Sequence, residues 1–144
     1  MNGEIEKKEQ KKAFLQSYQA LNFSIKTLGN LLAGFEEEQN HLLSVLQGDS
    51  GADLVAEMND IISSFRKQLG EKNQICKIIV KNVSRMDSEI EKNILLLKYI
   101  SGYTWEEISE MTNYSLRQVY NIHNHALKHF TMKQRLNQIT NNVK

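Results

Sequence analysis

Apolar side chains recur at intervals of four and three residues through the first third of the chain. This spacing places them along one side of an α-helix, as in the seam of a coiled coil. We therefore predict a long helix over about residues 14–46, and we expect residues 1–11, which are charged on all sides, to fray. Gly29 and Gly34 mark either a bend or a close helix contact, and they leave open two shorter helices. The apolar positions are Phe14, Tyr18, Leu21, Ile25, Leu28, Leu32, Phe35, Leu42 and Leu46, with the polar Gln39 inside the series.

A second apolar stripe follows the polar stretch at residues 47–52, which contains two glycines and is predicted to be a loop. Two long helices around a short loop favour an antiparallel hairpin. Because such a hairpin has little interior, we expect residues 14–84 to make a homo-oligomer, at least a homodimer. The alternative is a bundle within one chain, closed by a helix at residues 88–100. The second stripe comprises Leu54, Met58, Ile61, Phe65, Leu69, Cys76, Ile79 and Val83.

The segment at residues 88–100 is predicted to be a helix buried on more than one side, because its apolar residues exceed a single face. Ser88 and Glu91 fit a capping box at its start. Gly102 is suited to the left-handed position that ends it. We take this helix as the core of a C-terminal domain.

Two further capping boxes stand eleven residues apart, Thr104 with Glu107 and Ser115 with Gln118. They predict a short helix from Trp105 to about Met111 and a longer one at residues 115–130, which could continue toward Ile139. A short helix, a tight turn and a longer helix are typical of a helix-turn-helix. The fold class is therefore all-α, with a long coiled-coil-like hairpin at residues 1–84 and a helix-turn-helix domain at residues 85–144.

The longer helix is predicted to be amphipathic, because Ala126 and Phe130 both fall within about 20° of Val119 at 100° per residue. Its opposite side carries side chains that reach phosphates and base edges in DNA complexes. An ordinary solvent-exposed helix face would have a similar pattern, so we use the charge balance to choose between the two interpretations. Residues 113–144 hold five basic residues and no acidic one, whereas residues 27–65 hold seven acidic residues and no Lys or Arg. DNA is therefore the favoured ligand of the C-terminal part. The polar positions are Arg117, Asn121, Asn124 and Lys128.

Residues 93–109, 114–123 and the pair Ala126–Leu127 resemble region 4 of sigma factors, and most of all the sigma-region-4-like phage and prophage transcriptional regulators of the ArpU and RinA type. The resemblance extends over residues 87–130. It implies a helix-turn-helix that binds promoter DNA, with bacterial RNA polymerase as a further partner. Leu116, Tyr120 and Asn121 stand where several basic residues occur in that family. The positions that read DNA in the family correspond to Leu116, Arg117, Tyr120 and Asn121.

Other chemistry finds little support in the sequence. His125 and His129 stand at i and i+4, but no third ligand has usable spacing, and His123 is predicted to be partly buried and bonded to backbone. The single cysteine, Cys76, fits a small core side chain and a reducing cytoplasm. No apolar run has the length of a membrane span. We expect a cytoplasmic protein, associated with the nucleoid when bound, with no enzymatic activity, cofactor, metal or membrane partner.

The resulting hypothesis is a sequence-specific, DNA-binding transcriptional regulator of phage or prophage type. Two alternatives stay open, a small-terminase-like DNA-packaging protein and a polymerase- or sigma-binding module without DNA affinity. Trp105 is expected to pack in the core. The candidate DNA-binding residues are Thr104, Ser115, Leu116, Arg117, Gln118, Tyr120, Asn121, Asn124, Lys128 and Lys133.

Overall fold

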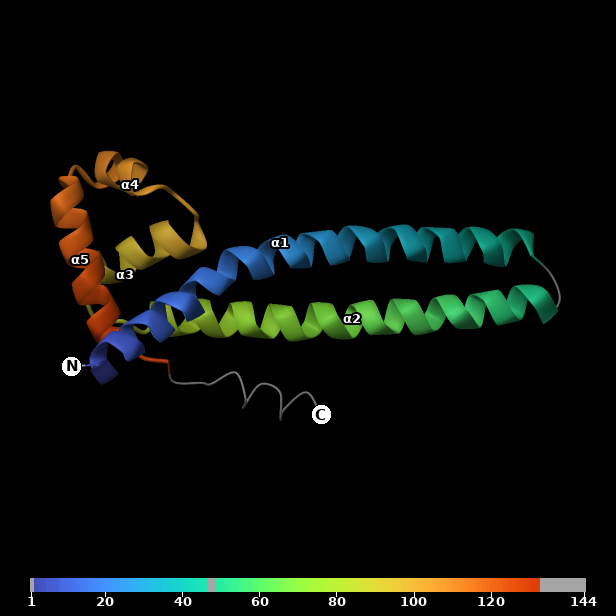
Figure 1. The fold of residues 1–144 in the computed structure, drawn as a ribbon. Helices are drawn as coiled ribbons and strands as arrows, with labels where there is room; N and C mark the ends of the chain where they lie inside the picture. Colours follow the sequence, from blue (N-terminus) through green and yellow to red (C-terminus); the bar gives the residue numbers. More distant parts are fainter. Residues whose placement is uncertain (1, 47–48, 133–144) are drawn as a thin grey trace. The chain divides into compact units, whose positions relative to one another are not determined.

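The computed structural model describes residues 2–46 and 49–132, and the regular secondary structure of this part of the chain consists of helices alone, which confirms the all-α class (Figure 1). Packing divides the chain into two compact units. The hairpin unit is residues 22–74, and the terminal unit is residues 1–21 together with the chain from residue 75 onward. The helices are α1 (Asn2–Val45), α2 (Asp49–Ser84), α3 (Glu89–Leu95), the π-helical turn η1 (Leu96–Ile100), α4 (Trp105–Thr112) and α5 (Leu116–His129).

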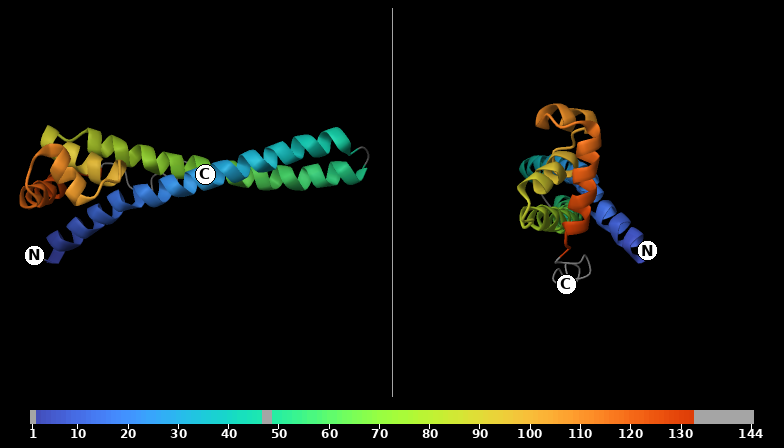
Figure 2. Two further views of the ribbon diagram at one scale, coloured as in Figure 1. Left: turned by 90° about the horizontal axis from the view of Figure 1, so that it is seen from above. Right: turned by 90° about the vertical axis from the view of Figure 1, so that its left-hand side faces the viewer.

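The hairpin unit is an antiparallel pair made from residues 22–45 of α1 and residues 49–74 of α2. Figures 1 and 2 show the two segments side by side. The rings of Phe35 and Phe65 meet edge to face at 5.7 Å between centroids. Nearer the tip, the Gln39 side-chain amide donates to the Val55 carbonyl at 3.4 Å. Because residues later in α1 pair with residues earlier in α2, the helices run in opposite directions.

The apolar seam predicted for α1 faces α2 over most of the hairpin, since its members from Ile25 to Leu42 are all at least half-buried. The stripe predicted for α2 is wrong at two positions. Ile62 is buried while Ile61 is 41% exposed, and Leu54 is exposed where the neighbouring Val55 is half-buried. Both errors have the same cause, because adjacent apolar residues fit the pattern equally well. In each pair both residues lie at helical spacing from the buried Met58, and the structure buries the second residue of the pair more deeply.

The predicted loop at residues 47–52 is too long, because α2 begins at Asp49. A Cβ atom at Gly51 would come within 2.9 Å of the Leu46 Cβ, so the absence of a side chain permits this close approach. The first helix is continuous across Gly29 and Gly34. Neither glycine would bring an added Cβ within 4 Å of another residue, so neither marks a close helix contact.

The terminal unit is built around a core that draws on both ends of the described chain. Phe14 and Leu15 of α1 pack with the end of α2, with η1 and with the end of α5. The sequence suggested a division between residues 84 and 85, whereas this core unites residues from both sides of it. Within this unit the helix after residue 88 therefore closes a bundle inside one chain. The buried members are Phe14, Leu15, Ile78, Ile79, Val83, Leu95, Tyr99, Ala126, Leu127 and Phe130.

The segment predicted as one helix at residues 88–100 widens into a π-turn after Leu95. The Ser101 N–H donates to the Leu96 carbonyl at 2.9 Å, five residues back. Gly102 then adopts φ of +81°, as predicted for the residue that ends this helix. The carbonyls of Tyr99 and Ile100 accept hydrogen bonds from the Gln19 side-chain amide at 3.0 and 2.9 Å. Gln19 thus satisfies acceptors that the helix end leaves open.

Only half of the capping box predicted at Ser88 forms. The Ser88 hydroxyl accepts the Glu91 N–H at 3.3 Å. The Glu91 carboxylate does not return to the cap, however, because it contacts Nδ1 of His129 at 2.6 Å. Among the described residues, no helix has the length and apolar content needed to cross a membrane.

Candidate nucleic-acid interface

Helices α4 and α5 are joined by a tight turn, and both begin with the capping boxes that the sequence predicts. Thr104 and Glu107 exchange hydrogen bonds of 3.2 and 3.1 Å, and the Thr104 N–H lowers the pKa of Glu107. Ser115 and Gln118 likewise exchange two hydrogen bonds, of 3.1 and 2.9 Å. Between the two helices Asn113 adopts φ of +62°, the predicted left-handed stop. The geometry of the turn is therefore determined by local hydrogen bonds.

A small separate core holds α4 against α5. Its centre is formed by one side chain from each of three helices, Ile94 of α3, Ile108 of α4 and Val119 of α5, all nearly inaccessible to solvent. Tyr114 from the turn and Trp105 from the start of α4 pack against it. Close packing of this kind leaves α5 one buried side and one solvent-facing side, and fixes which residues lie on each.

The solvent-facing side of α5 carries the predicted polar stripe. Arg117, Asn121, Asn124 and Lys128 are all exposed, while the apolar positions at Val119, Ala126 and Leu127 are buried. Within the described residues the side chains of Arg117 and Asn121 make no hydrogen bond. Their donors and acceptors are therefore accessible to a ligand that approaches α5 from solvent.

Several predicted site residues have partners within the protein. The side-chain oxygens of Thr104, Ser115 and Gln118 serve as helix caps. The Tyr120 ring packs edge to face on Trp105 at 5.3 Å between centroids. Leu116 is 38% exposed, at the first turn of α5. Lys133 lies outside the described residues.

Trp105 is half-buried and connects α4 to the exposed side of α5. Beside its contact with Tyr120, its ring lies 4.7 Å from that of His123, and the Lys98 ammonium sits 4.7 Å above it. Trp105 therefore packs against the core with part of its ring, as predicted, and its ring face also makes a cation–π contact with Lys98.

His123 is more buried than the sequence predicts, and its partner is a side chain rather than backbone. Its Nε2 lies 2.6 Å from the Tyr99 hydroxyl. Burial lowers the pKa of His123 to about 4, with further contributions from Lys12, Lys8 and Lys98. Burial also raises the pKa of Tyr99 to about 12. The imidazole is therefore neutral and the phenol keeps its proton, and the hydrogen bond between them ties η1 to α5.

The longer helix of the pair ends well before Ile139, the limit that the sequence allows. Helix α5 stops at His129, and Phe130 turns to an extended conformation with ψ of 130°. Its ring is completely buried and lies 6.3 Å from that of Phe14. Burial of this large side chain against α1 turns the chain away from the helix axis.

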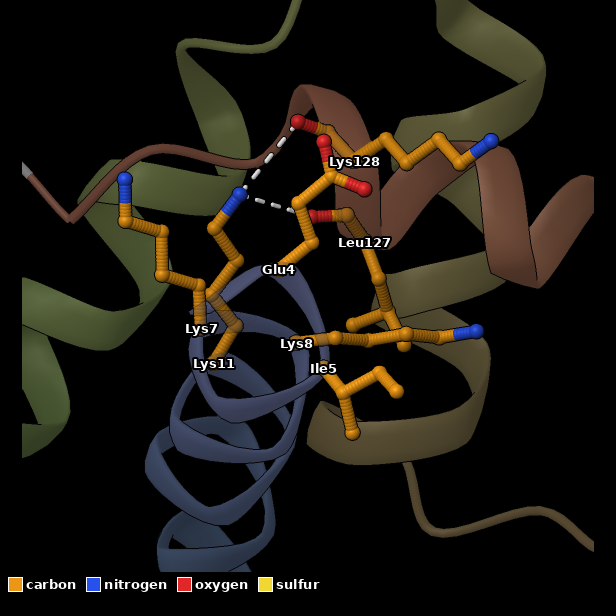
Figure 3. A pocket seen from close by; sticks show the side chains of 7 residues that line it. All are labelled: Glu4, Ile5, Lys7, Lys8, Lys11, Leu127 and Lys128. Carbon is orange, nitrogen blue, oxygen red and sulfur yellow. Dashed lines mark hydrogen bonds between the residues drawn. The ribbon is translucent and has the colours of Figure 1, made fainter. Parts of the chain in front are cut away.

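The first turns of α1 also belong to this region, which the sequence did not indicate. They are helical from Asn2 onward instead of frayed. The Lys11 ammonium donates to the carbonyls of Leu127 and Lys128 at the end of α5, at 2.9 and 3.3 Å (Figure 3). The Lys8 ammonium donates to Oδ1 of Asn124 at 2.9 Å. The only signal was the spacing of the lysines, which places them on one side of a helix.

Within the part of the chain that the structure describes, no three His, Cys, Asp or Glu side chains come close enough to hold a metal ion. Cys76 is buried in α2, and burial raises the pKa of its thiol. Comparison with protein-family models, with curated proteins and with solved structures found no match to this chain.

Proposed function

We propose that the protein is a sequence-specific DNA-binding regulator of transcription, of the phage or prophage type that resembles sigma region 4. Helix α5 lies in the major groove and α4 supports it from behind. The observation that carries this proposal is the exposed polar stripe on α5, from Arg117 to Lys128, on a helix held by a packed core. The major groove of B-DNA, about 12 Å wide, admits one α-helix whose side chains contact base edges.

The chemistry of the stripe assigns different roles to its members. Arg117, near the start of α5, can donate two hydrogen bonds to guanine, and Asn121 can pair with adenine. Lys128, near the end, is suited to a backbone phosphate. The exposed start of α4 at Thr104 lies at a helix N-terminus, where phosphates are favoured. Asn124 is bonded to Lys8, so this pair meets the DNA together.

Affinity arguments favour more than one copy on the DNA. A monomer with three or four phosphate contacts would bind weakly at physiological salt. A second copy, or RNA polymerase, would supply the missing affinity. The hairpin unit leaves large apolar side chains in solvent, with Phe23 at 73%, Leu43 at 58% and Val45 at 59% exposure. A second copy that covers them would stabilise a homodimer.

Selection of bound duplexes from a random-sequence library tests the proposal, since it works for a target of any sequence. We expect a consensus to emerge. Arg117→Ala should weaken binding to the selected duplex by about 1–3 kcal/mol and relax preference at one base pair. Arg66→Ala removes the same charge from the hairpin unit, where Arg66 is ion-paired with Glu36, and serves as the matched control. If Arg117→Ala has the same DNA affinity and base preference as the wild type, α5 is not the helix that reads the bases.

The mass of the protein in solution separates the remaining alternatives. A homodimer agrees with the regulator, whereas a ring of eight or more copies would favour a DNA-packaging protein. A module that binds only polymerase or a sigma factor would show no affinity for duplex DNA even at about 50 mM salt, where electrostatic attraction is strong.

A further inference from the structure

The first three turns of α1 gather four lysines on one side of the helix. At 100° per residue, Lys7, Lys8, Lys11 and Lys12 fall within an arc of about 140°. Glu4 shares this arc, whereas Glu6 and Glu9 fall outside it. The helix therefore presents a predominantly cationic side, although residues 2–12 taken together are close to neutral.

Three hydrogen bonds, two from Lys11 and one from Lys8, attach this cationic side to α5. Lys11 bridges the last carbonyls of α5, a position where a helix end favours positive charge. Lys8 reaches Asn124 on the exposed stripe. Burial, and then the nearby charge of Lys7, lower the pKa of Lys11, which agrees with crowding of like charges. The start of α1 is thus a fixed neighbour of α5.

A surface hollow of about 520 Å³ lies between the two helices, and Figure 3 shows that it is lined mainly by lysines. Lys7 and Lys128 are exposed beside it, and Lys8 is half-buried. Because Lys8 contacts Asn124, the hollow continues the polar stripe that runs along α5 from Arg117. Glu4 is the carboxylate that lines the hollow with four lysines, so their positive charge is offset only in part and an anion would be attracted there.

We propose that Lys7, Lys8 and Lys128 form a binding site for the phosphate backbone of duplex DNA, beside the groove that α5 enters. This inference rests on the proposed function and adds a second, sequence-independent contact to it. Duplex DNA carries one negative charge per about 1.7 Å along its axis, a density that several lysines can contact at once. The lysines position α5, while Arg117 and Asn121 read bases. The competing occupant is the acidic segment of a second copy.

The test measures binding to a 30-base-pair duplex of random sequence as a function of salt. Each lost phosphate contact lowers the slope of log K against log[salt] by about 0.9. For Lys7→Gln/Lys8→Gln we expect a slope smaller by about 1.8. Between 50 and 200 mM salt, the double variant should then lose about 12-fold less affinity than the wild type. Lys11 is left intact because it caps α5.

Three further variants sharpen the result. Lys26→Gln/Lys67→Gln removes the same charge from exposed positions of the hairpin unit and should leave the slope unchanged. Glu4→Gln removes the acidic residue at the hollow and should tighten binding, most clearly at low salt. Lys7→Gln alone should lower the slope by about 0.9, and because Lys7 is exposed this change leaves the fold intact.

The outcomes separate the two proposals. A wild-type protein that binds no duplex at about 50 mM salt overturns both. Binding with the same slope in wild type and Lys7→Gln/Lys8→Gln overturns the lysine site alone. A change in oligomeric state without a change in slope identifies a second copy as the occupant and likewise overturns it. A smaller slope of log K against log[salt] in Lys7→Gln/Lys8→Gln, on random and selected duplexes alike and with base preference retained, supports a backbone site.

Discussion

The Tyr99–His123 hydrogen bond is the buried polar contact on which α5 depends at the residue scale. It lies within the terminal unit, next to Trp105 and close to the positive charges of Lys8, Lys12 and Lys98. A protonated imidazole would add a further positive charge to this buried site. Stability of the terminal unit should therefore depend on His123 remaining neutral.

We expect acid to destabilise the protein through His123. Because its pKa falls from about 6.5 in the unfolded chain to about 4 in the folded protein, the unfolded state takes up the proton first. The contribution is fully present above pH 6.5 and is lost as the pH falls toward 4, to a total of about 3 kcal/mol. Urea unfolding of wild type and His123→Gln at several pH values measures it. Carboxylates titrate in both proteins, so equal pH dependence of the two would contradict the expectation.

At the scale of elements, glycines divide into those that the fold requires and those that it tolerates. Gly34 and Gly70 are exposed inside α1 and α2 and have open space where a side chain would be. Gly102 has a positive φ, and a Cβ there would meet the Gln19 side-chain amide at 3.2 Å. The same substitution should therefore have opposite effects at these sites.

Gly34→Ala and Gly70→Ala should each stabilise the protein by about 0.5–1 kcal/mol, because alanine restricts the unfolded chain and favours the helix. Gly102→Ala should destabilise it by at least about 1 kcal/mol, since its φ is unfavourable for a residue with a Cβ. Chemical denaturation of the three variants provides the comparison. A stabilising Gly102→Ala would show that the turn after η1 differs from the one described.

At the scale of the whole molecule, the terminal unit takes its core from both ends of the described chain. Phe14 and Leu15 contribute from α1, Ile79 and Val83 from α2, and Phe130 from the end of α5. The chain leaves this unit near Leu21 and re-enters near Ile75, and both residues pack against the same core. The two crossing points are therefore neighbours in space.

This arrangement predicts which fragments fold. Residues 85–144 alone should be poorly helical and prone to aggregate, because Leu95, Tyr99 and Phe130 would lose the apolar partners that α1 and α2 supply. Residues 1–21 joined to 75–144 by a short Gly/Ser linker should instead unfold cooperatively. Circular dichroism with thermal unfolding distinguishes the two. Cooperative unfolding of 85–144 on its own would contradict this view of the core.

The amino-acid sequence by itself determined the features that depend on residues a few positions apart. These include the all-α class, the seam of α1, the caps at Thr104 and Ser115, and the stops at Gly102 and Asn113. Each follows from hydrophobic period or local hydrogen bonding. The exposed stripe on α5 also followed from helical period.

Only the tertiary structure decided the contacts between distant residues. Lys11 and Leu127 are 116 residues apart, and Tyr99 and His123 are 24 apart. No local pattern specifies such pairs, because they depend on how whole helices pack. The same packing chose Ile62 over Ile61, ended α5 at His129 and placed the lysines of α1 beside α5. Where several residues satisfy the helical period equally well, burial of the complete core selects among them.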